Sequence, residues 1–300
     1  MKEPRHEIHC VTLTSSADAP WLVFSNGLNT DWRMWSFVIP MLLEHGYNML
    51  LHSQRGHGLS TMPEERGEER LTTIGLLGMD MGYLVEEIGI KTPVRSVIGV
   101  SQGGATTLGF AGMYGEEKTR SVVVCGTARA TPVGNKEAWD ERTRVVCGSS
   151  GYGWWKGDGL DMEEYGGRVG MKKLAKMTVP RWFPSGSCCH PGSGVDSGRV
   201  RWMERMIEQT RVRGFFHGAK ALGSYDVGEI GEKRVEEMLF IAGELDGGGK
   251  VGRGMRKMRD ELGGEYVEIG TSGHLPMIDC PDVFSDLVVS FLDKKRSIII

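Results

Sequence analysis

The fold of this 300-residue chain is decided by residues 96–105, which read SVIGVSQGGA. The apolar first half predicts a buried strand, and a helical pattern follows at residues 103–114. Gly99 and Gly103 flank Ser101 in the pattern Gly-x-Ser-x-Gly, which can place a serine in a strained turn between a strand and a helix. The chain has 44 glycines, so such a pattern would arise by chance in about one of two similar chains. The strand before it and the helix after it therefore carry the inference.

Other short apolar runs indicate that this strand belongs to a larger sheet. Strands are expected at residues 21–25, 48–52, 121–125, 238–242 and 265–269, and helices at 35–45, 77–88 and 281–292. Strands that alternate with helices are typical of a parallel sheet covered by helices on both faces. The sequence therefore predicts an α/β fold.

The sequence pattern changes after residue 129, which indicates a segment inserted in this sheet-based core. Residues 130–220 hold five of the eight tryptophans and several helical patterns, but no convincing buried strand. Within them, residues 148–170 are rich in glycine and are expected to be irregular. We therefore expect a core formed by residues 1–129 and 221–300, with a helical lid at residues 130–220.

A nucleophilic serine needs a base, and histidine is the usual one. Downstream of Ser101 the histidines are His190, His217 and His274. The first two fall in the expected lid, whereas His274 follows the last expected strand on a loop of small residues. His274 is therefore the candidate base, and a surface loop histidine is the alternative.

The histidine in turn needs an acid, which should precede it in the chain. Asp246 lies just past the expected strand 238–242 and is the candidate. Glu244 competes with it because residues two apart on an extended segment point the same way. A simple turn-capping role for Asp246 before three glycines is the other alternative.

Backbone N–H groups should stabilise the oxyanion that forms when the serine attacks a carbonyl. Gln102 follows the serine and supplies one such group. The second should come from residues 25–29, at the end of the first apolar strand, and Leu28 is the candidate because Gly27 permits the turn that exposes its N–H.

Composition excludes several function classes. The formal net charge of −3 gives no basic field for nucleic acid. The N-terminus lacks the apolar run of a signal peptide, and no stretch is long enough to span a bilayer, so we expect a cytoplasmic protein without membrane association. The six cysteines show no CxxC spacing, and Cys188-Cys189-His190 reads either as a fragment of a metal site or as reduced thiols on a loop. The latter is expected, with no metal or organic cofactor.

Nearly the whole chain resembles the α/β-hydrolase superfamily, and within it the 3-oxoadipate enol-lactonase family. The landmarks are SNGL at residues 25–28 with Trp35, QRGHGLS at 54–60, GVSQG at 99–103, CGTA at 125–128, WDER at 139–142, RWF at 181–183, GELD at 243–246 and GH at 273–274. The chain departs from the family at Ser53, where relatives usually carry an aspartate. Its glycine-rich lid segments also look longer than those of the family.

The resemblance implies a serine hydrolase with the triad Ser101, Asp246 and His274 that opens a small, carboxylate-bearing lactone in aromatic compound catabolism. It places Trp139 and Trp182 at the pocket wall, or simply in packing, and offers Arg181 as a partner for a substrate carboxylate or as a surface residue. Alternatives of the same fold are a carboxylesterase, a carbon–carbon bond hydrolase and a haloperoxidase. A binding or receptor protein without turnover is an alternative of a different class.

Overall fold

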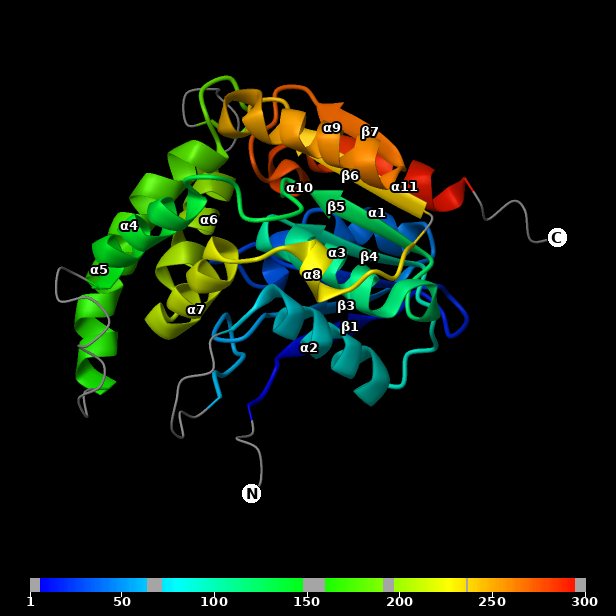
Figure 1. Cartoon of the computed structure of the whole chain (residues 1–300), viewed down its shortest axis with the longest axis horizontal. Coiled ribbons are helices and arrows are strands. Elements are labelled where there is room, and N and C mark those ends of the chain that lie inside the picture. The colour runs from blue at the N-terminus through cyan, green and yellow to red at the C-terminus, as the bar shows by residue number, and fades with distance from the viewer. Residues whose placement is uncertain (1–5, 64–71, 148–159, 191–196, 236, 295–300) are drawn as a thin grey trace.

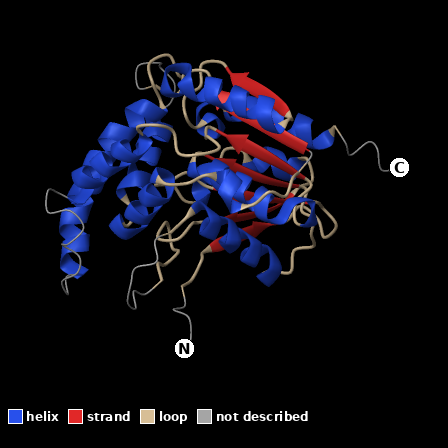
Figure 2. Ribbon diagram, viewed as in Figure 1, coloured by secondary structure: helices blue, strands red, loops and turns tan. Residues whose placement is uncertain are grey.

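A seven-stranded sheet forms the centre of the computed structural model, which describes residues 6–63, 72–147, 160–190, 197–235 and 237–294 (Figure 2). The strand order is β1-β3-β2-β4-β5-β6-β7. The strands are β1 (Cys10–Leu13), β2 (Trp21–Ser25), β3 (Asn48–His52), β4 (Ser96–Val100), β5 (Ser121–Cys125), β6 (Glu237–Gly243) and β7 (Glu265–Ile269). Only β1 runs antiparallel to its neighbour, and all other pairs are parallel. The α/β fold predicted from the sequence is confirmed.

Helices cover both faces of the sheet. Before the fifth strand they are α1 (Ile39–Glu44), α2 (Ile74–Glu87) and α3 (Gln102–Tyr114), with a short 3-10 helix η1 at Trp32–Trp35. After it come α4 (Asn135–Cys147), α5 (Leu160–Trp182), α6 (Ser197–Glu208), α7 (Val212–Gly223), α8 (Val227–Ile230), α9 (Lys250–Leu262), α10 (Pro276–Asp279) and α11 (Pro281–Asp293). The helix expected at 35–45 is thus split into η1 and α1.

Alternation along the strands assigns side chains to the two faces, because successive residues of a strand point to opposite sides. In β4, Val97 joins a cluster with residues of α2, α3 and α9, whereas Ile98 and Val100 join a cluster with residues of α1 and α11. Every residue of β3, β4 and β5 is buried. Full burial on both faces explains why these strands read as continuous apolar runs.

The helices α4–α7 lie together beyond the carboxyl ends of the strands, on the left in Figure 1. The chain leaves for them after β5 and returns before β6 at one narrow neck. There Ala130 pairs with Asp226 in an antiparallel bridge, and the N–H of Thr131 donates to the carbonyl of Tyr225 at 2.8 Å. We refer to the segment between Ala130 and Asp226 as the lid. That residues 130–220 form a separate unit stays a prediction.

The glycine-rich stretch expected to be irregular falls partly outside the described residues, at 148–159. From Leu160 onward it belongs to α5 instead. Within the described ranges, no helix combines the length and apolar character needed to cross a membrane.

Candidate active site

Ser101 occupies a strained turn between β4 and α3. Its backbone angles are φ 57° and ψ −119°, in a region that non-glycine residues rarely adopt. The flanking glycines make the turn possible. A Cβ on Gly99 would lie 2.1 Å from the carbonyl oxygen of Gly103, and one on Gly103 would lie 2.1 Å from that of Ser25. The glycine pattern around Ser101 is therefore a steric requirement of this turn.

The three candidate catalytic residues follow the carboxyl ends of β4, β6 and β7, and the end of β5 lies between those of β4 and β6. The N–H of Ser101 donates to the carbonyl of Cys125 at 2.9 Å. The next residue, Gly126, has φ +55°, and a Cβ there would lie 3.5 Å from both His274 Cε1 and Asp246 Oδ2. Gly126 thus lies between the serine turn and the other two residues, and its positive φ, rather than a lack of space, favours glycine there.

His274 and Asp246 form a direct hydrogen bond. Nδ1 of His274 lies 2.7 Å from Oδ2 of Asp246, and the carboxylate side chain is only 7% exposed. A buried carboxylate in this position orients the ring and stabilises the imidazolium. Glu244, the competing acid, instead accepts the N–H of Thr271 at 3.1 Å from an exposed position.

The loop that carries His274 is held from two sides. Oδ2 of Asp279 accepts the N–H of Gly273 at 2.7 Å, and the N–H of His274 donates to the carbonyl of Trp182 at 2.9 Å. Burial raises the pKa of Asp279, while the backbone N–H groups of Gly273 and Cys189 act in the opposite direction. Sequence reasoning missed Asp279, because nothing in the order of residues links it to His274.

The two candidate oxyanion residues lie beside this serine. Gln102 begins α3, so its N–H has no acceptor within the helix. Leu28 follows Gly27, whose Cβ would lie 3.6 Å from Cβ of Ser101. The loop is fixed by Asn26, whose Oδ1 accepts from Nε1 of Trp35 at 2.8 Å.

A buried histidine supports the same loop. Nε2 of His57 accepts the N–H of Asn29 at 3.2 Å, so Nδ1 carries the proton and donates to the carbonyl of Arg55 at 2.9 Å. Burial lowers the pKa of His57 to about 4, although the bond to Arg55 opposes this. His57 is therefore a neutral structural group at neutral pH.

The lid helix α7 packs directly against Leu28 and Gln102, the candidate oxyanion residues. The side chain of Gln102 donates from Nε2 to the carbonyl of Gly218 at 2.8 Å, and a Cβ on Gly218 would lie 2.3 Å from Cδ1 of Leu28. His217, on the same helix, accepts the N–H of Thr72 at 3.4 Å. Burial, reinforced by nearby arginines, lowers the pKa of His217 to about 4. His217 thus belongs to the packing between lid and core.

Trp182 is the substrate-binding candidate that lies against the candidate base. Its ring stacks on His274 with centroids 6.1 Å apart and an interplanar angle of 26°, and the residue is only 8% exposed. Trp139 lies on α4, partly buried, with the guanidinium of Arg142 4.4 Å from its ring centroid.

Arg142 was part of the WDER landmark without an assigned role. Burial lowers its pKa to about 10, and the positive charge of Arg181 contributes in the same direction. Burial also lowers the pKa of Arg181, and the negative charge of Asp246 opposes that effect. The two arginines thus repel one another close to the candidate acid, and a bound anion would relieve the repulsion.

A cavity of about 440 Å³ is lined in part by Thr30 and Asp31, on the segment after β2, and Ser101, Asp246 and His274 do not line it. Its walls include Asp31, Arg33 and Ser53. Ser53, where the resemblance leads us to expect an aspartate, is fully buried, and its hydroxyl has no hydrogen-bond partner among the described residues. We assign the cavity no part in the chemistry at Ser101.

Comparison with known proteins supports the fold and the resemblance. A family model described as "alpha/beta hydrolase fold" matches residues 20–146. The chain is 26% identical over 279 residues to 3-oxoadipate enol-lactonase 2 of Acinetobacter baylyi, an alignment that covers 93% of this chain and 90% of the relative.

Solved structures give the same result. The enol-lactonase from Burkholderia xenovorans superposes with a TM-score of 0.76 at 24% identity, covering 96% of this chain and 97% of that one. A thermophilic esterase from Thermogutta terrifontis gives a TM-score of 0.75 at 18% identity, with coverage of 96% and 94%. These structures show the fold, and the sequence similarity to the Acinetobacter enzyme confirms the resemblance expected from the sequence.

Proposed function

Because this chain has the α/β-hydrolase fold and is similar in sequence to 3-oxoadipate enol-lactonases, we propose that it is a serine hydrolase that opens a small lactone bearing a carboxylate. The observation that carries the proposal is the His274–Asp246 hydrogen bond at the strand ends where Ser101 occupies its strained turn. This arrangement is suited to acyl transfer without a metal or organic cofactor.

The reaction begins when His274 takes the proton of Ser101 as its hydroxyl oxygen attacks the ring carbonyl. The N–H groups of Leu28 and Gln102 stabilise the negative charge on the carbonyl oxygen. Cleavage of the ring ester bond expels an enolate, which takes the proton from His274 and becomes a ketone, and leaves an acyl group on Ser101. Water that His274 deprotonates then attacks this acyl-enzyme and restores the serine.

Arg142 and Arg181 support a negatively charged substrate. Arg142 is half-buried and Arg181 is exposed, and the charge of Arg181 lowers the pKa of Arg142. A substrate carboxylate beside both guanidinium groups would gain charge-assisted hydrogen bonds. The ring of Trp139 under Arg142 keeps that guanidinium in place. In this proposal the lid supplies specificity and the core supplies the chemistry.

A rate assay on 3-oxoadipate enol-lactone beside neutral p-nitrophenyl esters and other lactones tests the proposal. The wild-type chain should prefer the enol-lactone, and Ser101→Ala should lower kcat by about 10⁴-fold or more with an unchanged circular dichroism spectrum. Faster turnover of neutral esters would favour a carboxylesterase, and unchanged hydrolysis by Ser101→Ala would overturn the mechanism.

The charge of the substrate is tested in the same assay with a matched pair of variants on α4. Arg142→Gln should raise KM for the anionic lactone by about tenfold and leave KM for a neutral ester unchanged. Arg144→Gln removes an exposed guanidinium two residues away and should change neither value. Equal effects of Arg142→Gln on both substrates would contradict recognition of a carboxylate.

A further inference from the structure

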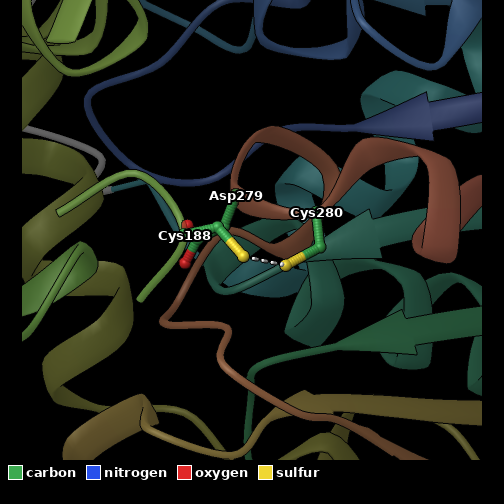
Figure 3. Close-up of side chains that lie close together, drawn as sticks. All are labelled: Cys188, Asp279 and Cys280. Carbon is green, nitrogen blue, oxygen red and sulfur yellow. Dashed lines mark hydrogen bonds between the residues drawn. The ribbon is translucent and has the colours of Figure 1, made fainter. Parts of the chain in front are cut away.

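Two thiols from distant parts of the chain lie in contact beside the His274 loop (Figure 3). Sγ of Cys188 is 3.2 Å from Sγ of Cys280, although 92 positions separate them in the sequence. Cys188 lies on the loop that follows the lid helix α5, and Cys280 lies at the start of α11. Both residues are half-buried, so small reagents can reach them.

Backbone hydrogen bonds hold the two cysteines in place. The N–H of Cys188 donates to the carbonyl of Thr271 at 3.0 Å, and the N–H of Cys189 donates to Oδ1 of Asp279 at 2.7 Å. The N–H of Cys280 donates to the carbonyl of Pro276 at 2.9 Å. Because a disulfide joins sulfurs about 2.05 Å apart, the two side chains need to close only about 1 Å on this fixed backbone.

We propose that Cys188 and Cys280 form a reversible disulfide that ties the loop after the lid helix α5 to the start of α11, six residues past His274. The oxidant is a small-molecule disulfide, RSSR. The thiolate of Cys188 attacks one of its sulfurs, forms a mixed disulfide and releases RS⁻. The thiolate of Cys280 then attacks the Cys188 sulfur, closes the protein disulfide and releases a second RS⁻. Two protein thiols are oxidised, one RSSR is reduced, and the two thiol protons pass to the released RS⁻.

The local electrostatics assign the order of the two steps. Burial raises the pKa of Cys280 to about 12, and the neighbouring groups Cys188 and Asp279 contribute in the same direction. Cys280 is thus a poor first nucleophile, whereas it faces the mixed disulfide at once when Cys188 has reacted. Closure should accordingly become faster as the pH rises above neutrality.

A metal site is the competing interpretation of the same cluster. Cys188, Asp279 and Cys280 offer ligand atoms within 4.8 Å of one another. However, both carboxylate oxygens of Asp279 already accept backbone N–H groups, from Cys189 and Gly273. A structural zinc site also requires four ligands, and this cluster brings together three among the described residues. The geometry therefore favours the disulfide.

The position of the tether gives it a consequence for the site. Trp182, six residues before Cys188, stacks on His274 and accepts its N–H. The bond between Cys188 and Cys280 fixes the other end of this short segment to the start of α11, six residues past His274. Oxidation therefore restrains the segment that holds Trp182 on the candidate base.

Peptide mapping of the full-length protein tests the proposal without reference to its activity. The reduced chain is incubated with oxidised glutathione, alkylated and digested with trypsin. We expect a loss of about 2 Da from the intact mass and a linked pair of peptides, 182–199 and 260–294. The link should form in Cys189→Ser, which removes the adjacent thiol, and should be absent in Cys188→Ser and Cys280→Ser. In the wild type, the disulfide should also raise Tm by about 5 °C.

Three results would overturn the proposal. The first is that both thiols remain free at every glutathione ratio while the protein stays folded. The second is a link that persists in Cys280→Ser or disappears in Cys189→Ser, because the pairing would then involve another cysteine. The third is stoichiometric protection of both thiols by Zn²⁺ alone, which would assign the cluster to a metal.

Discussion

Ser101 carries a side chain and yet adopts a backbone conformation with positive φ, which ordinarily favours glycine. A non-glycine residue in such a conformation costs about 1–3 kcal/mol. Hydrogen bonds on both sides hold it there, since its N–H donates to Cys125 and its carbonyl accepts from Ala105 at 3.1 Å. The strain is thus confined to the residue that must project from the sheet edge.

The hydrogen bond between His274 and Asp246 predicts a large loss of activity when the charge of Asp246 is removed. Asp246→Asn keeps the shape of the side chain but removes the charge that stabilises the imidazolium, so kcat should fall by about 10³–10⁴-fold. Steady-state kinetics on the preferred substrate, with Tm measured in parallel, provides the check.

Glu244 offers the matched control, because it lies two residues away and only accepts the N–H of Thr271. Glu244→Gln retains an oxygen for that bond and should change kcat by less than about threefold. A larger loss from Glu244→Gln than from Asp246→Asn would move the acid to position 244.

Among single residues, the sequence could predict only those whose position follows from their order in the chain and from the end of a strand. Ser101, Asp246 and His274 each follow an expected strand, and the carboxyl ends of parallel strands lie at the same end of the sheet. Asp279 and Arg142 act through neighbours that only the folded chain supplies. The contact between Cys188 and Cys280 was invisible for the same reason.

Among the elements, α7 connects the lid most directly to the predicted oxyanion site. Gly218 lets the helix approach Leu28 and Gln102, since even a methyl group there would lie 2.3 Å from Leu28. Gly218→Ala should therefore displace Leu28 and lower kcat/KM by about 10–100-fold. Adding Leu28→Ala, which frees the space but keeps the backbone N–H, should restore much of the activity.

Gly223, at the end of the same helix, is the control for this substitution. A Cβ there would make ordinary contact with Lys136 at 3.7 Å, so Gly223→Ala should leave kcat/KM within about twofold. If both variants lost activity equally, a general change in α7 would explain the loss, and close packing at Gly218 would not.

The elements that the sequence failed to predict have weak local signals. The strand β1 has four residues, lies at the edge of the sheet and is mostly half-exposed, so it lacks the apolar run of a central strand. The helix α9 carries Gly252 and Gly254 directly after three glycines, which read as a loop. Its buried Met255 and Met258 show that packing on the sheet decides the helix.

For the whole molecule, buried histidines predict a loss of stability in acid. Burial lowers the pKa of His52, His57 and His217 to about 4 in the folded protein, against about 6.5 when unfolded. Between these values the unfolded chain binds more protons, so the free energy of unfolding rises with pH and is lost as pH falls. The loss should be about 2 kcal/mol per histidine between pH 7 and pH 5.

Urea unfolding at a series of pH values measures this slope. His52→Gln should flatten it, whereas His45→Gln, at an exposed position, should leave it unchanged. A slope that is identical in all three proteins would show that His52 does not contribute to it.

The narrow neck at Ala130 and Asp226 also bears on how such a molecule can diversify. Ala130 and Asp226, at the two ends of the lid, pair in one bridge. The distance between the two ends is therefore short, whatever the number of residues in the lid. Closing a longer loop between paired ends adds little entropic cost. A different segment can therefore replace this one between the same two ends, while the strands that precede Ser101, Asp246 and His274 keep their places.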